Sequence, residues 1–294
     1  MRVTVFIPLK LGPWPADCRG VTPESSLLTA APTDNRLRFG QIATQYDRVR
    51  PGYPDELIDA VLAYGRLDPT TPVLDVGAGT GQATVQFATR GLSVIALDPS
   101  AEMVQIANAK FADAGLDAVA VVGEFESAPL GENRFGLIYA ATSWHWLDPD
   151  VCFQVAAGLI APGGTLAVLS TWPLWRRSEL RPALDQAYLD SGAPLAEMGP
   201  ICPIEPDPGA LAAEWMRETR GCGAFGDQQG KLASWSQTYS AAGYVELLGT
   251  YGDHIGLEPG VRERLFDGIV DVIGAAGGTI ELGYATLLLL ARAL

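Results

Sequence analysis

The sequence predicts an α/β fold built on a doubly wound, mostly parallel sheet, and three observations support this. An apolar run, Val73–Val76, ends in glycines at positions 77, 79 and 81, and a second apolar run then ends on Asp98. Further short apolar runs recur along the chain, with segments of helical periodicity between them. These runs are continuously apolar rather than alternating, as expected of strands that helices cover on both faces. Strands connected through helices pair in parallel, with right-handed crossovers.

The predicted elements follow in the order that this fold requires. Pro54 suits a first helical position, and the helix that it opens ends at Gly65. Ser100 is placed to cap a helix that ends at Gly115. In chain order, the other predicted elements are strand 73–76, helix 82–89, strand 94–98, strand 118–122, strand 137–141, helix 151–159, a turn at 162–164, strand 165–170, helix 259–273 and strand 284–291.

Two segments of the chain, one N-terminal and one internal, differ from the predicted sheet and its helices. Residues 1–33 hold five prolines and little periodicity, and we interpret them as an N-terminal extension. Within it, Val3 to Ile7 is a candidate edge strand; otherwise the segment is flexible or reflects an upstream start codon. Residues 34–294 form one predicted domain, with core segments 34–171 and 223–294. Residues from about 172 to 222 are rich in Trp and Pro, and we expect a helical cap over the carboxyl ends of the strands.

Composition excludes several classes of protein. The 294 residues carry 34 acidic against 20 basic side chains, a net charge of −14, which argues against a nucleic-acid partner. Two histidines and four cysteines without a C-x-x-C pair predict no metal site. No apolar segment reaches the ~18 residues of a membrane span, and the first residues make a poor signal peptide. We therefore expect a cytoplasmic protein that binds no membrane.

The spacing of the glycines separates possible ligands. A dinucleotide-binding G-x-G-x-x-G would need glycine where Gln82 or Thr84 stands, and no Lys-Ser/Thr of a P-loop follows. The pattern that remains is D-x-G-x-G-x-G, from Asp75 to Gly81. Its glycines allow a ligand to approach the backbone closely, and Asp98 at the next strand end can accept hydrogen bonds from two ribose hydroxyls. The alternative is an ordinary glycine turn followed by a solvated acid.

At these residues the chain resembles the class I S-adenosylmethionine-dependent methyltransferases, specifically the small-molecule, methyltransferase type 11-like group. The resemblance covers about residues 36–294. It implies a Rossmann-like sheet of seven strands, S-adenosyl-L-methionine as cofactor, and in-line methyl transfer to a small molecule, with proximity and a shielded pocket as the main catalytic effects. Gly136 stands where the family often has an acid, so no role is carried to that position. The matching segments are Phe39 to Pro54, the glycine turn, Asp98, Gly123 to Leu130, Phe135 to Trp146, and Pro162 to Gly164.

The resemblance also assigns candidate binding residues. Glu124 would accept a hydrogen bond from the adenine amino group, with Phe125 beside the ring; otherwise Glu124 is a solvated acid. Arg50 would pair with the methionine carboxylate and Tyr46 would cover the methyl group; otherwise Arg50 forms a surface salt bridge. The full cofactor-binding set is Tyr46, Arg50, Asp75, Gly77, Ala78, Gly79, Gly81, Asp98, Pro99, Met103, Glu124, Phe125 and Ala141.

The candidate for acid–base chemistry is His145, between two tryptophans after the fourth core strand. A free imidazole titrates near pH ~6.5, which suits a general base. Alternatively His145 packs a pocket wall, since an anionic acceptor needs no base. Trp172, Trp175 and Trp235 are candidates for lining an acceptor site, and we expect His254 to be structural.

Two other functions fit the same residues: cofactor-dependent chemistry without methylation, such as cyclisation or decarboxylation, and a catalytically inactive regulatory role. The glycine spacing disfavours a nicotinamide oxidoreductase. Nucleic-acid methylation is disfavoured by the charge and because Thr142 to His145 replace an Asn/Asp-Pro-Pro-Tyr/Phe tetrapeptide.

Overall fold

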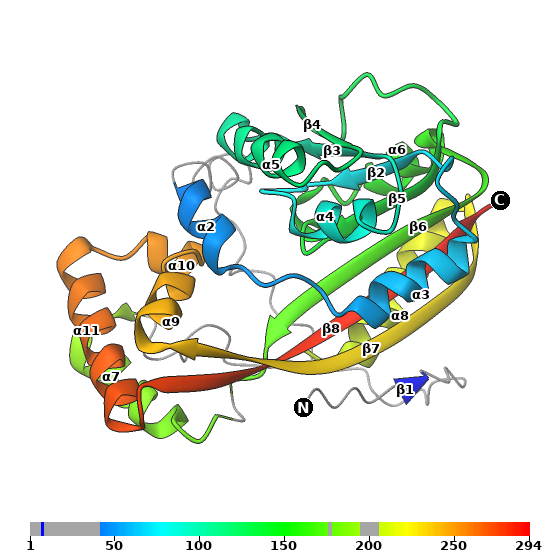
Figure 1. Ribbon diagram of the computed structural model, residues 1–294. Coiled ribbons are helices and arrows are strands. Elements are labelled where there is room, and N and C mark those ends of the chain that lie inside the picture. The colour runs from blue at the N-terminus through cyan, green and yellow to red at the C-terminus, as the bar shows by residue number, and fades with distance from the viewer. Residues whose placement is uncertain (1–6, 9–41, 176–177, 195–205) are drawn as a thin grey trace, which may run out of the picture.

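The computed structural model describes residues 7–8, 42–175, 178–194 and 206–294. Within these residues one sheet runs in the order β1-β7-β8-β6-β5-β2-β3-β4 (Figure 1). Its strands are β1 (Ile7–Pro8), β2 (Val73–Val76), β3 (Val94–Asp98), β4 (Ala118–Val122), β5 (Phe135–Ala141), β6 (Ile160–Pro173), β7 (Phe225–Ser240) and β8 (Thr279–Ala293).

The predicted doubly wound sheet of seven strands is confirmed by β2 to β8. The five neighbouring strands β4, β3, β2, β5 and β6 pair in parallel. Strand β8 runs antiparallel to both β6 and β7. The two-residue β1 adds an eighth strand, antiparallel to β7. Of the predicted N-terminal extension, only Ile7 and Pro8 are among the described residues, and Ile7 takes the edge position expected for it.

Helices cover both faces of the sheet, as the apolar strands predicted. On one face, Ile58 and Phe87 pack in one cluster with Leu137 and Tyr139 of β5. The alternate residue Ile138 points the other way and packs in a cluster with helices of the opposite face. The first face carries α3 (Asp55–Gly65), α4 (Gln82–Ala88) and α5 (Ala101–Asp113); the second carries α6 (Cys152–Leu159) and α8 (Pro208–Cys222).

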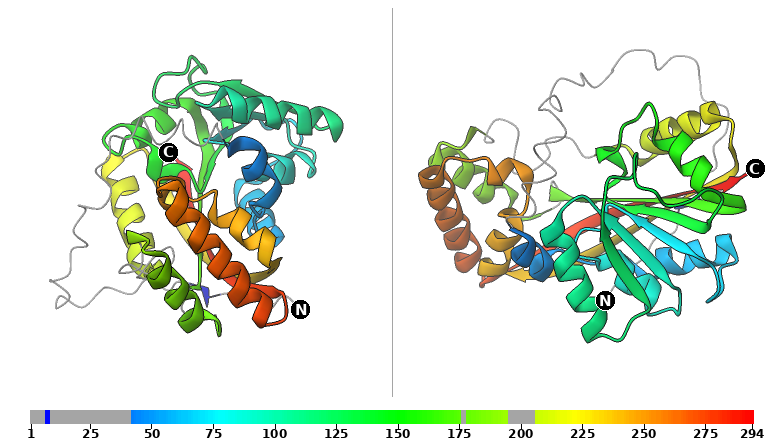
Figure 2. Two further views of the ribbon diagram at one scale, coloured as in Figure 1. Left: turned by 90° about the vertical axis from the view of Figure 1, so that its left-hand side faces the viewer. Right: turned by 90° about the horizontal axis from the view of Figure 1, so that it is seen from above.

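A second group of helices packs around the far ends of β7 and β8, and we call it the helical lobe (residues 181–191 and 241–278; Figures 1 and 2). Its core joins Leu184, Leu247 and Leu265 to Leu282 of β8. The lobe consists of α7 (Arg181–Ser191), α9 (Ala241–Leu248), α10 (Gly252–Ile255) and α11 (Pro259–Ala275), and α2 (Ala43–Val49) contacts α9.

The lobe differs from the expected cap over 172–222. Within that range α7 joins the lobe, but α8 packs on the sheet, because its buried Trp215 and Met216 belong to the sheet cluster. Residues 176–177 and 195–205 of the expected cap lie outside the described part. Most of the lobe comes instead from the connection between β7 and β8, which the sequence did not mark as a cap.

Two local predictions also need correction. Strand β7 was not predicted, because Phe225–Ser240 is mostly polar and only half-buried. The expected turn at 162–164 lies inside β6, although Gly163 has a φ of +75°. No helix in the described residues combines the length and apolar character needed to cross a membrane.

Candidate functional site

The glycine turn after β2 places three glycines in left-handed backbone, and they serve different purposes. The φ angles of Gly77, Gly79 and Gly81 are +67°, +56° and +82°. A Cβ on Gly77 would lie 2.5 Å from Cβ of Ser143, and one on Gly81 would lie 2.6 Å from the Phe111 ring. A Cβ on Gly79 would meet only Tyr46, at 3.8 Å. Gly77 and Gly81 are therefore required for packing, whereas Gly79 leaves open space for a ligand.

Two neighbouring cavities open at the carboxyl ends of the parallel strands, where ligands bind in this type of sheet. The larger measures about 360 Å³ and the smaller about 100 Å³. Every predicted cofactor-binding residue except Gly81 lines at least one of them. Tyr46, Arg50 and Gly77 line both; Gly79, Asp98, Pro99, Met103, Glu124 and Phe125 line the larger cavity, and Asp75, Ala78 and Ala141 line the smaller.

Asp98 ends β3 with its carboxylate held on both oxygens. Oδ2 accepts a hydrogen bond from the backbone N–H of Gly79 over 2.8 Å, and Oδ1 accepts one from Ser100 N–H over 2.9 Å. Burial raises the pKa of Asp98, while these two backbone donors lower it. Each oxygen keeps a second lone pair. The carboxylate can thus accept further hydrogen bonds from a ligand in the larger cavity.

Asp75 is a buried carboxyl with one oxygen unpaired. Its Oδ2 accepts hydrogen bonds from Thr84 Oγ1 at 2.6 Å and from the Tyr139 hydroxyl at 2.9 Å. Its buried Oδ1 has no hydrogen-bond partner among the described residues. Burial raises the pKa of Asp75 to about 7. A buried, unpaired acceptor beside a cavity is costly unless a ligand or water satisfies it.

Arg50 is a guanidinium fixed beside both cavities. Its Nε donates to Thr250 Oγ1 at 2.9 Å and its Nη2 donates to the Thr250 carbonyl at 2.8 Å. The group also lies over the rings of Tyr46 and Tyr251, at 4.9 and 4.2 Å from their centroids. No carboxylate pairs with Arg50 among the described residues. The alternative to ligand binding, a surface salt bridge, is therefore absent among these residues, and the guanidinium can receive an anionic ligand group.

The loop after β4 lines the larger cavity. Phe125 is buried and lies 6.3 Å, between ring centroids, from Trp144. Glu124 is exposed and lines the same cavity. Both side chains are thus beside the cavity, where the adenine roles require them.

His145 also reaches the larger cavity, as predicted, on the short helix η3 (Trp144–Trp146). His145 is exposed, but the surrounding protein atoms partly desolvate the imidazole. This desolvation lowers its pKa. No carboxylate orients the ring among the described residues. His145 is therefore neutral at pH 7 and available to accept a proton.

The three candidate acceptor-site tryptophans lie elsewhere. Trp172 and Trp175 are buried in the sheet and lobe clusters. Trp235 stacks on Tyr284, with ring centroids 4.5 Å apart, and lines neither cavity. His254 is fully buried in the lobe, 2.7 Å from the Tyr188 hydroxyl, which agrees with a structural role.

Sequence reasoning missed three residues that line both cavities: Thr142, Thr171 and Tyr251. Thr142 directly follows β5 and Thr171 lies near the end of β6. Their positions at the carboxyl ends of strands were a usable signal. Tyr251 comes from the helical lobe, and no local pattern marks it.

Comparison with known proteins agrees with this geometry. Residues 73–164 match the family of the methyltransferase domain, and this stretch includes the glycine turn, Asp98 and the loop after β4. These residues form a methyltransferase domain, which agrees with the resemblance to the class I S-adenosylmethionine-dependent enzymes. An uncharacterised methyltransferase of Mycobacterium tuberculosis is 37% identical over 142 residues, which is 48% of this chain and 55% of that protein. A putative methyltransferase of Dictyostelium discoideum is 31% identical over 139 residues, 47% of this chain and 51% of that protein.

The chain spans about half the length of these curated relatives. Among solved structures, the cyclase SpnF superposes with a TM-score of 0.52 at 21% identity, covering 87% of this chain and 93% of that one. YcgJ from Bacillus subtilis superposes with a TM-score of 0.51 at 16% identity, covering 81% and 98%. These likenesses extend the shared fold beyond the matched domain.

Proposed function

We propose that this protein transfers the methyl group of S-adenosyl-L-methionine to a small-molecule acceptor. The observation that carries the proposal is the arrangement of charge around the paired cavities. Asp98, bound to the Gly79 N–H, faces the larger cavity. The unpaired Oδ1 of Asp75 and the guanidinium of Arg50 stand beside the smaller one.

The residues present fit the proposed cofactor. A ribose offers two hydroxyl donors to Asp98, and an adenine amino group offers a donor to Glu124. An amino-acid group offers an ammonium to Asp75 and a carboxylate to Arg50, which presents parallel donors. The orphaned buried oxygen of Asp75 is the most specific sign, because the ionised carboxylate can be satisfied only by a donor.

The cofactor supplies an electrophilic methyl group on a sulfonium. The chain's own residues supply position and exclusion of water. Arg50 connects the core to the lobe through Thr250 and lies over the ring of Tyr251, which lines both cavities. Holding two reactants in place can supply ~7–11 kcal/mol in favourable cases.

Titration calorimetry with S-adenosylhomocysteine and with NAD tests the cofactor. We expect binding of S-adenosylhomocysteine alone, and loss of that binding in the Arg50→Gln variant. Incubation of the protein with methyl-labelled S-adenosylmethionine and a metabolite extract then tests transfer. Labelled product that Asp98→Ala protein does not form supports the proposal. Binding of NAD in place of S-adenosylhomocysteine refutes it, and binding without any labelled product favours a non-methylating role.

A further inference from the structure

Two threonines, Thr142 and Thr171, line both cavities, and nothing in the cofactor assignment uses their hydroxyls. Thr142 follows β5, and Thr171 lies near the end of the adjacent strand β6. The Thr142 backbone N–H donates to the Leu169 carbonyl of β6 at 2.7 Å, which fixes the register of the two strand ends.

Thr142 is held in an unfavourable backbone conformation by its surroundings. Its φ is +60°, which is rare for a β-branched residue and costs free energy. The Tyr53 hydroxyl donates to Thr142 Oγ1 at 3.1 Å, and burial raises the pKa of Tyr53, so the donor keeps its proton. The Thr142 hydroxyl hydrogen has no acceptor among the described residues. It is free to point into the cavities.

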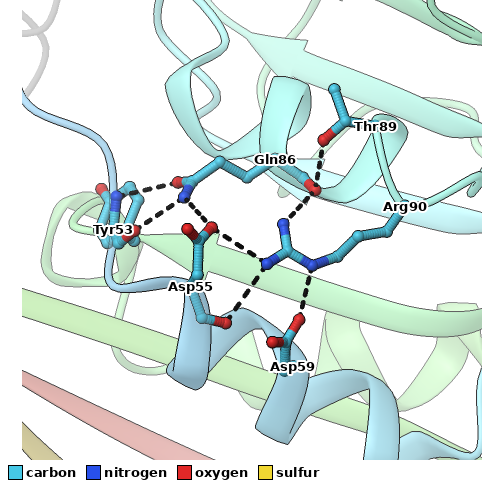
Figure 3. Close-up of polar contacts among 6 residues, drawn as sticks. All are labelled: Tyr53, Asp55, Asp59, Gln86, Thr89 and Arg90. Atoms are coloured by element: carbon cyan, nitrogen blue, oxygen red, sulfur yellow. Dashed lines mark hydrogen bonds and ion pairs between the residues drawn. The ribbon is translucent and has the colours of Figure 1, made fainter.

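The backbone of Tyr53 is itself held by a network of hydrogen bonds and ion pairs, as Figure 3 shows. Gln86 accepts from Tyr53 N–H at 2.9 Å and donates to the Tyr53 carbonyl at 2.7 Å. Arg90 in turn donates to the Gln86 carbonyl at 2.9 Å and to carboxylates of Asp55 and Asp59 at 3.0 and 2.7 Å. This network fixes the backbone from which the Tyr53 ring reaches Thr142.

Thr171 is hydrogen-bonded to Thr286, its cross-strand partner on the adjacent strand β8. The Trp235 indole N–H donates to Thr286 Oγ1 at 2.9 Å, and Thr286 Oγ1 lies 2.9 Å from Thr171 Oγ1. Thr286 is fully buried, so its own hydrogen needs an acceptor, and the one available among the described residues is Thr171. The chain therefore runs from Trp235 through Thr286 to Thr171. The hydrogen of Thr171 is then free to donate into the cavities.

We propose that the hydroxyls of Thr142 and Thr171 form a two-donor site that holds an anionic oxygen of the methyl acceptor, the chemistry of a carboxylate. This inference rests on the proposed function, since it names the acceptor class of the same cavities. Two fixed O–H donors favour a group with several lone pairs and disfavour an ammonium, which has none. Trp235 acts through Thr286 and is a positioning residue.

The test measures binding in protein saturated with S-adenosylhomocysteine, using three probes of similar size: phenylacetate, neutral phenylacetamide and cationic phenethylamine. We expect phenylacetate to bind at least about tenfold more tightly than the other two, because hydrogen bonds to a charged acceptor are the stronger ones. Equal binding of the three probes overturns the inference. So does phenylacetate binding that occurs in the free protein but is lost once S-adenosylhomocysteine saturates it, which would place the carboxylate at the cofactor site beside Arg50.

Variants assign the effect to the hydroxyls. Thr171→Val keeps the shape of the side chain and should weaken phenylacetate binding about tenfold, with S-adenosylhomocysteine affinity unchanged. Trp235→Phe keeps a ring on Tyr284 but lacks the N–H, and should lose part of the preference for phenylacetate over phenylacetamide. The exposed Thr238→Val, on β7, is the matched control and should behave as wild type.

The outcomes separate the two proposals. Wild-type protein that fails to bind S-adenosylhomocysteine refutes the proposed function. Protein that binds it, but in which Thr171→Val matches Thr238→Val, refutes only the two-donor site.

Discussion

The backbone N–H of Gly79 donates a 2.8 Å hydrogen bond to Oδ2 of Asp98, which joins the turn after β2 to the last residue of β3. The other oxygen of the same carboxylate accepts from the N–H of Ser100, the residue that caps α5. One side chain thus shapes the glycine turn, supports a helix start and faces the larger cavity. Its removal must affect both stability and binding.

We therefore expect Asp98→Ala to weaken S-adenosylhomocysteine binding at least tenfold and to destabilise the free protein. Two backbone N–H groups lose their acceptor, a cost of about 1–3 kcal/mol. Calorimetry and urea unfolding measure the two effects. Ser100→Ala is the control: it removes the side-chain cap on Met103 N–H, costs about 1 kcal/mol, and should leave affinity unchanged. Unchanged affinity in Asp98→Ala would exclude a ribose role.

Paired alanine substitutions separate the two functions of the glycine turn. In Gly81→Ala the new Cβ meets the Phe111 ring at 2.6 Å in left-handed backbone, so we expect about 2–4 kcal/mol of destabilisation. In Gly79→Ala only the backbone cost of about 1–2 kcal/mol applies, while the Cβ enters ligand space and weakens S-adenosylhomocysteine binding about tenfold or more. Equal effects of both variants on affinity would contradict this division.

Local sequence was sufficient for the part of the fold that binds the cofactor. Val73–Val76 and Val94–Asp98 were predicted to the residue, because both are short, mostly apolar runs, the first followed by a glycine and the second ending on an acid. Strand β7 escaped prediction because Phe225–Ser240 is polar and half-buried, and its strand conformation depends on pairing with β8. Propensity cannot identify a strand that its neighbour stabilises.

The site shows the same limit. The glycine pattern and the acid at the next strand end identified Gly79 and Asp98. These two residues lie close in sequence, and their contact joins two adjacent strands. The partner of Arg50 is Thr250, which lies 200 residues away on the helical lobe. Nothing in the sequence near either residue indicates that contact. For the same reason the expected cap over 172–222 supplies only α7 to the described lobe, whose other helices meet after β7 and β8 have paired.

The pH dependence of cofactor binding tests the role of Asp75. Its pKa of about 7 in the free protein means that the carboxylate is mostly neutral at pH 6 and mostly ionised at pH 8. If Asp75 pairs with the ligand ammonium, S-adenosylhomocysteine should bind about tenfold more tightly at pH 8 than at pH 6. Calorimetry at the two pH values measures this difference.

Stability should change in the opposite direction. Between the ordinary pKa of Asp75, 3.8, and about 7, the native protein keeps a proton that the unfolded chain has released. This group therefore makes the ligand-free protein less stable as the pH rises through that window. Asp75→Asn should remove both pH dependences. If binding to the Asp75→Asn variant still depends on pH, another group causes the dependence. Asp98 is such a group, because burial raises its pKa too.

The contribution of His145 should depend on the acceptor. Its pKa is lowered, so the neutral imidazole accepts a proton at pH 7. We expect His145→Ala to reduce kcat about 100-fold for acceptors that must lose a proton, with S-adenosylhomocysteine affinity unchanged. An acceptor with an ionised oxygen needs no base, and its kcat should fall by less than about threefold. Labelled-methyl assays on the two kinds of acceptor measure the contrast. Equal turnover by variant and wild type on both kinds would leave His145 only a packing role, whereas equal losses on both would point to positioning rather than proton transfer.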